Sequence, residues 1–183
     1  MAALVYCGNA NGPRLCYANT APSQVITNTT TETAFDTFFV FPSQATHSVQ
    51  PISVMRMEAR GLVSTGLINL NITLRLRWGG IGGAIICSTG VSALGASLND
   101  VGWSCNATCL ITDVGADGEM EIQGYAAFAS GVLSIGADYM PNTSPIALNT
   151  TITNDVVVTA QWANATANNQ IQVRTMVVEV DGP

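Results

Sequence analysis

Strict alternation of apolar and polar residues is the dominant pattern along this chain. It is clearest in residues 70–77, where the apolar positions are Leu70, Ile72, Leu74 and Leu76 and the polar ones are Asn71, Thr73, Arg75 and Arg77. A helix would spread the four apolar side chains around its circumference, whereas a strand places all of them on one face. The segment therefore predicts a strand whose apolar face lies in the core.

The same pattern recurs through most of the chain. Further strands are predicted at residues 35–41, 54–64, 84–88 (fully buried), 103–112, 120–126, 156–162 and 171–180. Residues 115–118 predict a hairpin turn, because glycine adopts positive φ at little cost. The glycine run 79–83 predicts a tight connection, since a phosphate loop needs a lysine and a following helix. Short strands separated by turns predict an all-β fold, an antiparallel β-sandwich or jelly roll.

The first 24 residues lack this alternation. They contain Gly8, Gly12, Pro13 and Pro22 and no periodic apolar row, so we expect neither a strand nor a helix there. Several of their side chains are nevertheless too apolar for a free tail: Leu4, Val5, Tyr6, Leu15 and Tyr17. We therefore expect residues 1–24 to form an extended N-terminal arm that docks on another subunit or on another protein. A jelly-roll domain is predicted over residues 25–183.

Charge is scarce, at 10 % of the residues against the ~25 % usual in globular domains. All six basic residues are arginines, and the net charge is −6. Binding to nucleic acid or to an anionic membrane is not expected, because both need clustered cations. No stretch approaches the ~20 apolar residues of a membrane span. A neutral polar surface is typical of proteins covered by partners, or of a stable extracellular β domain whose surface is merely neutral. We favour the first and expect a homo-oligomer.

The arginines give two interpretations. Arg56 and Arg60 alternate with core positions of one predicted strand, and Arg75 and Arg77 with those of the next. If these strands were hairpin neighbours, the four charges would form one laddered patch. Such a patch is either a solvated face with cross-strand pairing or a subunit contact, where arginine is favoured.

Catalytic chemistry finds little support. His47 is the single histidine and lies in a polar segment between predicted strands, so neither a Ser/His/Asp triad nor a Cys/His pair is indicated. The acids Asp113, Asp117, Glu119 and Glu121 crowd one hairpin, as solvated charges or as a weak calcium site. No enzyme activity and no cofactor are expected.

The chain has five cysteines: Cys7, Cys16, Cys87, Cys105 and Cys109. No CxxC pair occurs, and one histidine cannot complete a Cys/His zinc site. Cys105 and Cys109 lie about 13 Å apart along their predicted strand, too far to bond each other. The cysteines are expected to be buried free thiols, with a Cys7–Cys16 loop as the open alternative.

Four short segments carry a family resemblance: residues 31–35 (TETAF), 74–80 (LRLRWGG), 159–162 (TAQW) and 167–171 (ANNQI). Together they resemble a loose group of tailed-bacteriophage virion proteins with small jelly-roll domains, found as head-decorating (cement) proteins and fibre components. The resemblance covers about residues 28–180. It implies a non-enzymatic virion part, commonly a trimer, and it carries over no catalytic or binding residue.

Two functions are compared on this basis. The first is a capsid-decorating protein, assembled in the host cytoplasm, that binds the major capsid protein and stabilises the assembled head. The second is a fibre or receptor-binding domain that recognises a host-surface glycan, for which Tyr125, Tyr139 and Asp138 are the candidate residues. A third, a secreted trimeric β domain, lacks support because residues 1–8 do not have the pattern of a signal peptide.

Overall fold

The structure is a computed structural model that describes residues 3–4, 14–43, 51, 53–68, 70–131, 134–142 and 144–181. Regular structure in these residues is entirely β. The strands are β1 (Ala3–Leu4), β2 (Arg14–Ala18), β3 (Ile26–Thr27), β4 (Thr33–Phe41), β5 (Val54–Ser64), β6 (Asn71–Trp78), β7 (Ala84–Ser88), β8 (Ser92–Ala93), β9 (Val101–Asp113), β10 (Gly118–Gly131), β11 (Ser134–Pro141), β12 (Ile146–Leu148), β13 (Asn154–Trp162) and β14 (Gln170–Asp181). In the same ranges, no helix is long and apolar enough to cross a membrane.

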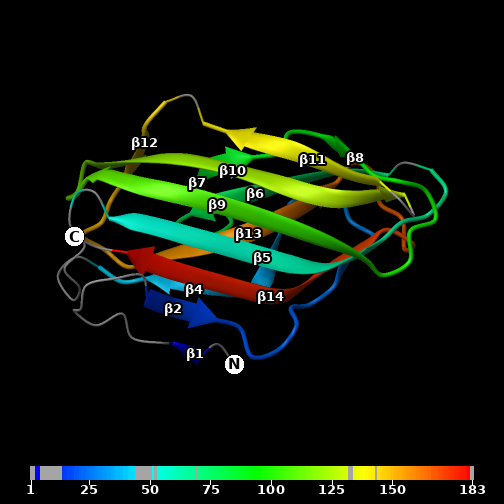
Figure 1. Ribbon diagram of the computed structural model, residues 1–183, viewed down its shortest axis with the longest axis horizontal. Helices are drawn as coiled ribbons and strands as arrows, with labels where there is room; N and C mark the ends of the chain where they lie inside the picture. Colours follow the sequence, from blue (N-terminus) through cyan, green and yellow to red (C-terminus); the bar gives the residue numbers. More distant parts are fainter. Residues whose placement is uncertain are drawn as a thin grey trace.

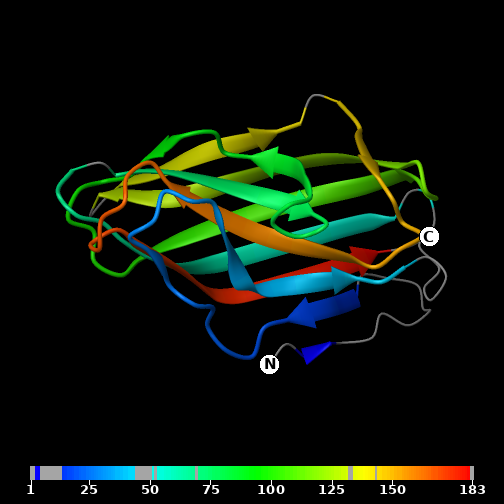
Figure 2. The same cartoon turned by 180° about the vertical axis from the view of Figure 1, so that it is seen from behind.

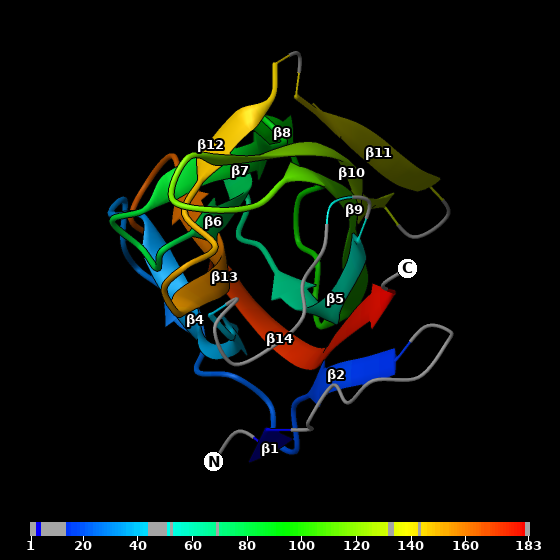
Figure 3. The ribbon, with the colours of Figure 1, turned by 90° about the vertical axis from the view of Figure 1, so that its left-hand side faces the viewer.

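The strands form two antiparallel sheets that face each other across the core. Sheet A has the order β1-β2-β14-β5-β9-β10-β11, with β12 beside β10 and β3 beside β14. Sheet B has the order β4-β13-β6-β7, with β8 beside β6. Figure 1 looks onto sheet A and Figure 2 onto sheet B, and Figure 3 shows the two sheets from one end.

Eight strands of the described chain have the jelly-roll arrangement. They are ordered β2-β14-β5-β9 in sheet A and β4-β13-β6-β7 in sheet B. The early strands β2 and β4 pair with the late strands β14 and β13, so the chain winds back on itself as in a double Greek key. Strands β10, β11 and β12 come between β9 and β13 in the chain and extend sheet A. The predicted antiparallel jelly-roll sandwich is confirmed.

The core is built from the alternating rows that the sequence predicts. In β6, Ile72, Leu74 and Leu76 are buried, and Leu70 packs against the core just before the strand begins. The inward row of β9 is buried along its whole length: Trp103, Cys105, Ala107, Cys109 and Ile111. That of β13 is equally buried: Val156, Val158, Ala160 and Trp162. Aromatic rings join the two sheets, as where Phe35 of β4 stacks on Trp103 at 6.0 Å.

The expectation that residues 1–24 contain no strand is wrong, because β1 (Ala3–Leu4) and β2 (Arg14–Ala18) form there. The longer of the two is the more informative. This segment is β2, which pairs antiparallel with β14 and places Tyr17 opposite Val178. The Tyr17 side chain is only 2 % exposed, and its ring lies 6.3 Å from that of Phe39. The five residues of β2 are too few for their alternation to stand out, but hydrogen bonding to β14 stabilises the strand. The sheet thus begins before the predicted domain boundary at residue 24.

Two further expectations need correction. Strands β5 and β6 are consecutive but belong to different sheets, because residues 65–70 carry the chain across the sandwich. The β5 arginines and the β6 arginines therefore lie on opposite outer faces and do not form one patch. Strand β7 was expected to be fully buried, yet Ile85 is 46 % exposed, because β7 is the last strand in the order of sheet B.

Candidate functional site

The outer face of sheet A carries an exposed pair of tyrosines. Tyr125 of β10 and Tyr139 of β11 are direct partners in the strand register. Directly opposite residues of an antiparallel pair point to the same side, with their Cβ atoms about 5 Å apart. Their neighbours Ala126 and Met140 point into the core and are fully buried, whereas the tyrosines are 45 % and 81 % exposed. Two aromatic side chains thus stand side by side in solvent.

Polar side chains continue the row of the tyrosines across the sheet. Tyr125 lies opposite Asn106 of β9, and Asn106 lies opposite Glu58 of β5. Glu58, Asn106, Tyr125 and Tyr139 therefore form one line over four adjacent strands, each about 4.8 Å from the next. We call this line the tyrosine row. The four strands run side by side in Figure 1. The row combines an aromatic surface with an amide and a carboxylate.

A pocket of about 370 Å³ opens beside the tyrosine row. The lining residues are Thr108, Leu110, Glu121, Ile122, Gln123, Asn142, Ser144 and Pro145. Thr108 and Gln123 are cross-strand partners in the line adjacent to the tyrosine row, so the row and the pocket are continuous. The pocket has its second wall where the chain between β11 and β12 passes Glu121. Its volume is at the small end of the range for ligand pockets.

The charges of this face differ in how they are paired. Arg60 forms an ion pair with Glu58. Arg56 lies 3.7 Å from Asp181. Among the residues the structure describes, no cation pairs with Glu121, which is exposed at the pocket. The pocket is therefore polar and carries one uncompensated negative charge.

This arrangement suits a ligand with an apolar face and a polar rim. Tyrosine rings provide a large apolar surface, and their hydroxyl groups remain available for hydrogen bonds. Asn106 and Gln123 carry amides that both donate and accept, while Glu121 only accepts when ionised. The Asn142 amide is already used within the chain, since it donates to the Ile86 carbonyl and accepts from the Ser144 N–H. The site contains no histidine, cysteine or lysine among its described residues. It is built for recognition by stacking and hydrogen bonding.

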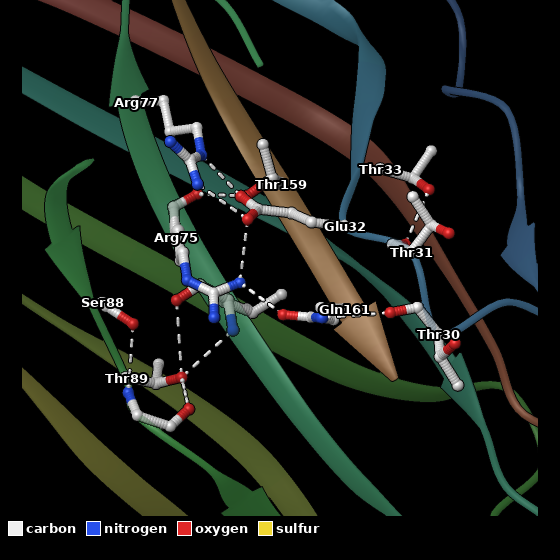
Figure 4. A network of polar contacts seen from close by, with 12 residues as sticks. Thr30, Thr31, Glu32, Thr33, Arg75, Arg77, Ser88, Thr89, Thr159 and Gln161 are labelled. Atoms are coloured by element: carbon white, nitrogen blue, oxygen red, sulfur yellow. Dashed lines mark hydrogen bonds and ion pairs between the residues drawn. The ribbon is translucent and has the colours of Figure 1, made fainter. Parts of the chain in front are cut away.

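The predicted arginines of β6 lie on the other sheet, in a compact ionic network (Figure 4). Arg77 donates two hydrogen bonds to the Glu32 carboxylate, from Nε to Oε1 at 2.6 Å and from Nη2 to Oε2 at 2.7 Å. Arg75 lies 3.1 Å from Oε2, and the Thr159 hydroxyl donates to Oε1 at 2.5 Å. These contacts lower the pKa of Glu32, the Arg77 hydrogen bonds contributing most, against the opposing effect of burial.

The network connects the chain before β4 to the outer face of sheet B. Arg75 donates to Gln161 Oε1 at 2.9 Å, and Gln161 donates to the Thr30 carbonyl at 3.0 Å. Arg77 also donates to the Gly83 carbonyl at 2.7 Å. The side chains of Glu32, Arg75 and Arg77 are only 14–19 % exposed. The guanidinium groups of Arg75 and Arg77 therefore have partners within the chain. Their role in a subunit contact stays a prediction.

The predicted docking residues of the N-terminal segment that the structure describes lie in the paired strands β1 and β2. Leu4 is in β1, opposite Tyr17, and Leu15 is in β2. Tyr17 is covered by its own domain, so it is not available to another subunit. Val5 and Tyr6 lie outside the described residues. Tyr17 is therefore a core residue.

Of the remaining predicted groups, Glu121 lines the pocket, and the others are exposed at the β9–β10 hairpin, buried in the core or outside the described chain. His47 lies outside it, and the acids of the β9–β10 hairpin are exposed. Within the described ranges, no three His, Cys, Asp or Glu side chains gather as a metal site requires. Cys87, Cys105 and Cys109 are buried free thiols, and burial raises the pKa of Cys87 to about 12. The expectation of a free thiol is wrong for Cys16, which is disulfide-bonded to a partner outside the described residues.

The tyrosines and Glu121 are candidates from the sequence, whereas Asn106 and Gln123 are not, and the proximity of these residues to one another is not predicted either. Asp138, named with the tyrosines, is opposite the buried Ala126 and so faces away from the tyrosine row. Asn106, Glu121 and Gln123 fall on the polar positions of the alternating pattern, which fixes their face. Their proximity to Tyr139 depends on the β9–β10–β11 register, which alternation does not specify.

Comparison with known proteins adds no family. No family model and no curated protein matches the sequence. Among solved structures, the chain is similar to one described as the CBM2 module of the evolved Dit of Lactobacillus casei BL23 phage J-1, with 11 % identity. The match covers 96 % of this chain and 83 % of that one, with a TM-score of 0.34. A TM-score this low carries no conclusion about fold or function.

Proposed function

We propose that this chain is a non-enzymatic, glycan-recognising domain of a bacteriophage virion, which binds a host-surface glycan on the outer face of sheet A. The observation that carries the proposal is the pair Tyr125 and Tyr139, exposed side by side and in line with Asn106 and Glu58. The virion component rests on the sequence resemblance described above.

The chemistry of a sugar ring matches this surface. One face of a pyranose presents C–H groups, and its edge presents hydroxyls that both donate and accept hydrogen bonds. The C–H face stacks on aromatic rings, and the amides and carboxylate beside the tyrosines can bind the hydroxyls. Tyr139 is 81 % exposed, so its ring gains little from folding and is available to a ligand.

One argument for the capsid-decorating function no longer holds. It relied on an N-terminal arm free to clasp a neighbour, and residues 14–18 instead pair with β14 of the same chain. The low surface charge and the jelly roll fit both functions. Binding to the major capsid protein and assembly as a homotrimer remain predictions.

A glycan array tests the proposal. The full-length chain is applied to immobilised bacterial cell-wall polysaccharides and defined oligosaccharides, beside Tyr125→Ala, Tyr139→Ala and the double variant. Each single variant should weaken binding at least about fivefold, since base–aromatic stacking, the nearest measured analogue, contributes about 1–3 kcal/mol per ring. The matched control is Ile85→Ala, which removes an exposed apolar side chain from sheet B.

A second measurement separates a glycan site from a protein contact. Sedimentation of the same variants reports their oligomeric state. If the tyrosine variants dissociate an oligomer and leave glycan binding unchanged, the tyrosines form a subunit interface and the proposal is wrong. Loss of binding with unchanged sedimentation supports it.

A further inference from the structure

We infer that the pocket beside the tyrosine row selects an uncharged sugar and rejects acidic ones, so that the ligand is a neutral oligosaccharide longer than one ring. The inference rests on the proposed function and names its ligand class. It depends on the geometry that joins the pocket to the tyrosines and on the charge of Glu121.

The geometry requires more than one sugar. Glu121, Gln123 and Tyr125 are successive outward residues of β10. At about 3.4 Å per residue, Glu121 lies about 14 Å from Tyr125 along the strand. A single sugar ring cannot contact Glu121 and the tyrosines together. A chain of sugars can place one ring in the pocket and stack the next on the tyrosines.

The pocket can bind one ring through its hydroxyls. Thr108, Gln123 and Ser144 present hydroxyl and amide groups, and Glu121 presents a carboxylate. An ionised carboxylate accepts hydrogen bonds only, so it requires donors from the ligand. Sugar hydroxyls are such donors. Hydrogen bonds from them to a charged acceptor are stronger than those between neutral groups.

The negative charge of the pocket disfavours acidic sugars. No described cation lines the pocket, and the nearby arginines Arg56 and Arg60 are paired with Asp181 and Glu58. The exposed Asp113, Asp117 and Glu119 of the same hairpin add negative potential. Repulsion between two carboxylates at contact distance in a half-open pocket weakens binding by roughly tenfold or more.

The test uses paired probes of equal length. Glucose and galactose trisaccharides are compared by titration calorimetry with glucuronic and galacturonic acid trisaccharides at pH 7, together with the neutral monosaccharides. The neutral trisaccharide should bind at least about tenfold more tightly than its acidic counterpart and than the monosaccharide. Raising the salt from 0.01 M to 1 M shortens the Debye length from about 30 Å to 3 Å and should narrow the neutral-to-acidic ratio.

Two variants test whether Glu121 causes the preference for neutral sugars. Glu121→Gln keeps the shape and removes the charge, so the neutral-to-acidic ratio should fall to within about threefold. Asp155→Asn removes one exposed charge from sheet B and should leave the ratio unchanged. The inference is wrong if acidic probes bind as tightly as neutral ones in a Tyr125-dependent manner. It is also wrong if the neutral-to-acidic affinity ratio is unchanged in Glu121→Gln. Neither result contradicts the proposed function. If no probe binds in a Tyr125-dependent manner, the proposed function itself fails.

Discussion

Replacing Glu32 by glutamine removes the charge at the centre of the network on sheet B. The Glu32 carboxylate accepts two hydrogen bonds from Arg77 and one from Thr159, and it forms an ion pair with Arg75. Glutamine has one acceptor oxygen in place of two and carries no charge. It therefore leaves two poorly solvated guanidinium groups without a counter-ion.

The structure sets the expected magnitude. Removing one partner of a buried ion pair costs about 3–5 kcal/mol, and a hydrogen bond to a charged group contributes about 1.5–3 kcal/mol. The Glu32 side chain is 17 % exposed, so solvent screens part of the interaction. We expect Glu32→Gln to lower the free energy of unfolding by about 2–4 kcal/mol. At about 2–4 °C per kcal/mol for a chain of this size, the melting temperature falls by roughly 5–15 °C.

Urea unfolding between pH 3 and pH 8 measures this cost and its pH dependence. The network lowers the pKa of Glu32 from its usual value of 4.5 in the folded chain. Its contribution to stability is therefore complete above pH 4.5 and is lost as the pH falls through the folded-state pKa. The difference in unfolding free energy between wild type and Glu32→Gln should be greatest at pH 7 and should shrink as the pH falls.

The exposed Glu119 provides the control for this experiment. Glu119→Gln should change the unfolding free energy by less than about 0.5 kcal/mol, as is usual for surface substitutions. A Glu32→Gln variant as stable as the Glu119 control at pH 7, or a gap that widens in acid, would refute the reasoning.

Three further predictions concern the core. Leu74 is fully buried, so Leu74→Ala should cost about 2–5 kcal/mol in urea unfolding, and a loss below about 1 kcal/mol would contradict its burial. A chain that begins at Ser23 lacks β2 and should melt at least about 10 °C lower by calorimetry, since it loses buried core side chains worth several kcal/mol; an unchanged melting temperature would mean that β2 is not part of the core. The thiols of Cys87, Cys105 and Cys109 should resist alkylation at pH 8 until the chain unfolds, because burial raises their pKa values; rapid labelling of the native protein, located by mass spectrometry, would count against this.

The long strands could be predicted from the sequence because their side chains alternate without interruption. β5 begins and ends at Val54 and Ser64, as predicted, with Met55, Met57 and Ala59 buried. A shift of one residue would move such a row to solvent, so the pattern strongly specifies which face is inside. For strands of this length, the sequence therefore predicts both the strand itself and the face that lies in the core.

Which strands are neighbours is a different kind of information. The alternation in β5 and β6 fixes the face of Arg56 and Arg75, but it does not say that residues 65–70 cross between the sheets. Short strands cannot be predicted from the sequence for another reason. β2 has five residues and is stabilised by pairing with β14, more than 150 positions later in the chain. Its burial is a property of the folded sheet, which no local pattern reports.

The candidate site was predictable only in part for the same reason. Tyr125 and Tyr139 could be named as exposed aromatics, since both occupy positions where a core residue was not needed. Their pairing depends on the β10–β11 register. The contribution of Asn106 from β9 and the pocket beside Gln123 depend on three strands and a connection lying together.

The central claim is that a glycan binds on the outer face of sheet A, and backbone amide chemical shifts test it most directly. The ¹⁵N-labelled full-length chain is titrated with the neutral trisaccharide that binds best on the array. The largest shift changes are expected at the amides of Asn106, Gln123, Tyr125 and Tyr139, while the amide shifts of sheet B residues such as Thr159 should not change. Shift changes centred on sheet B, or equal changes in the Tyr125→Ala and Tyr139→Ala double variant, would contradict it.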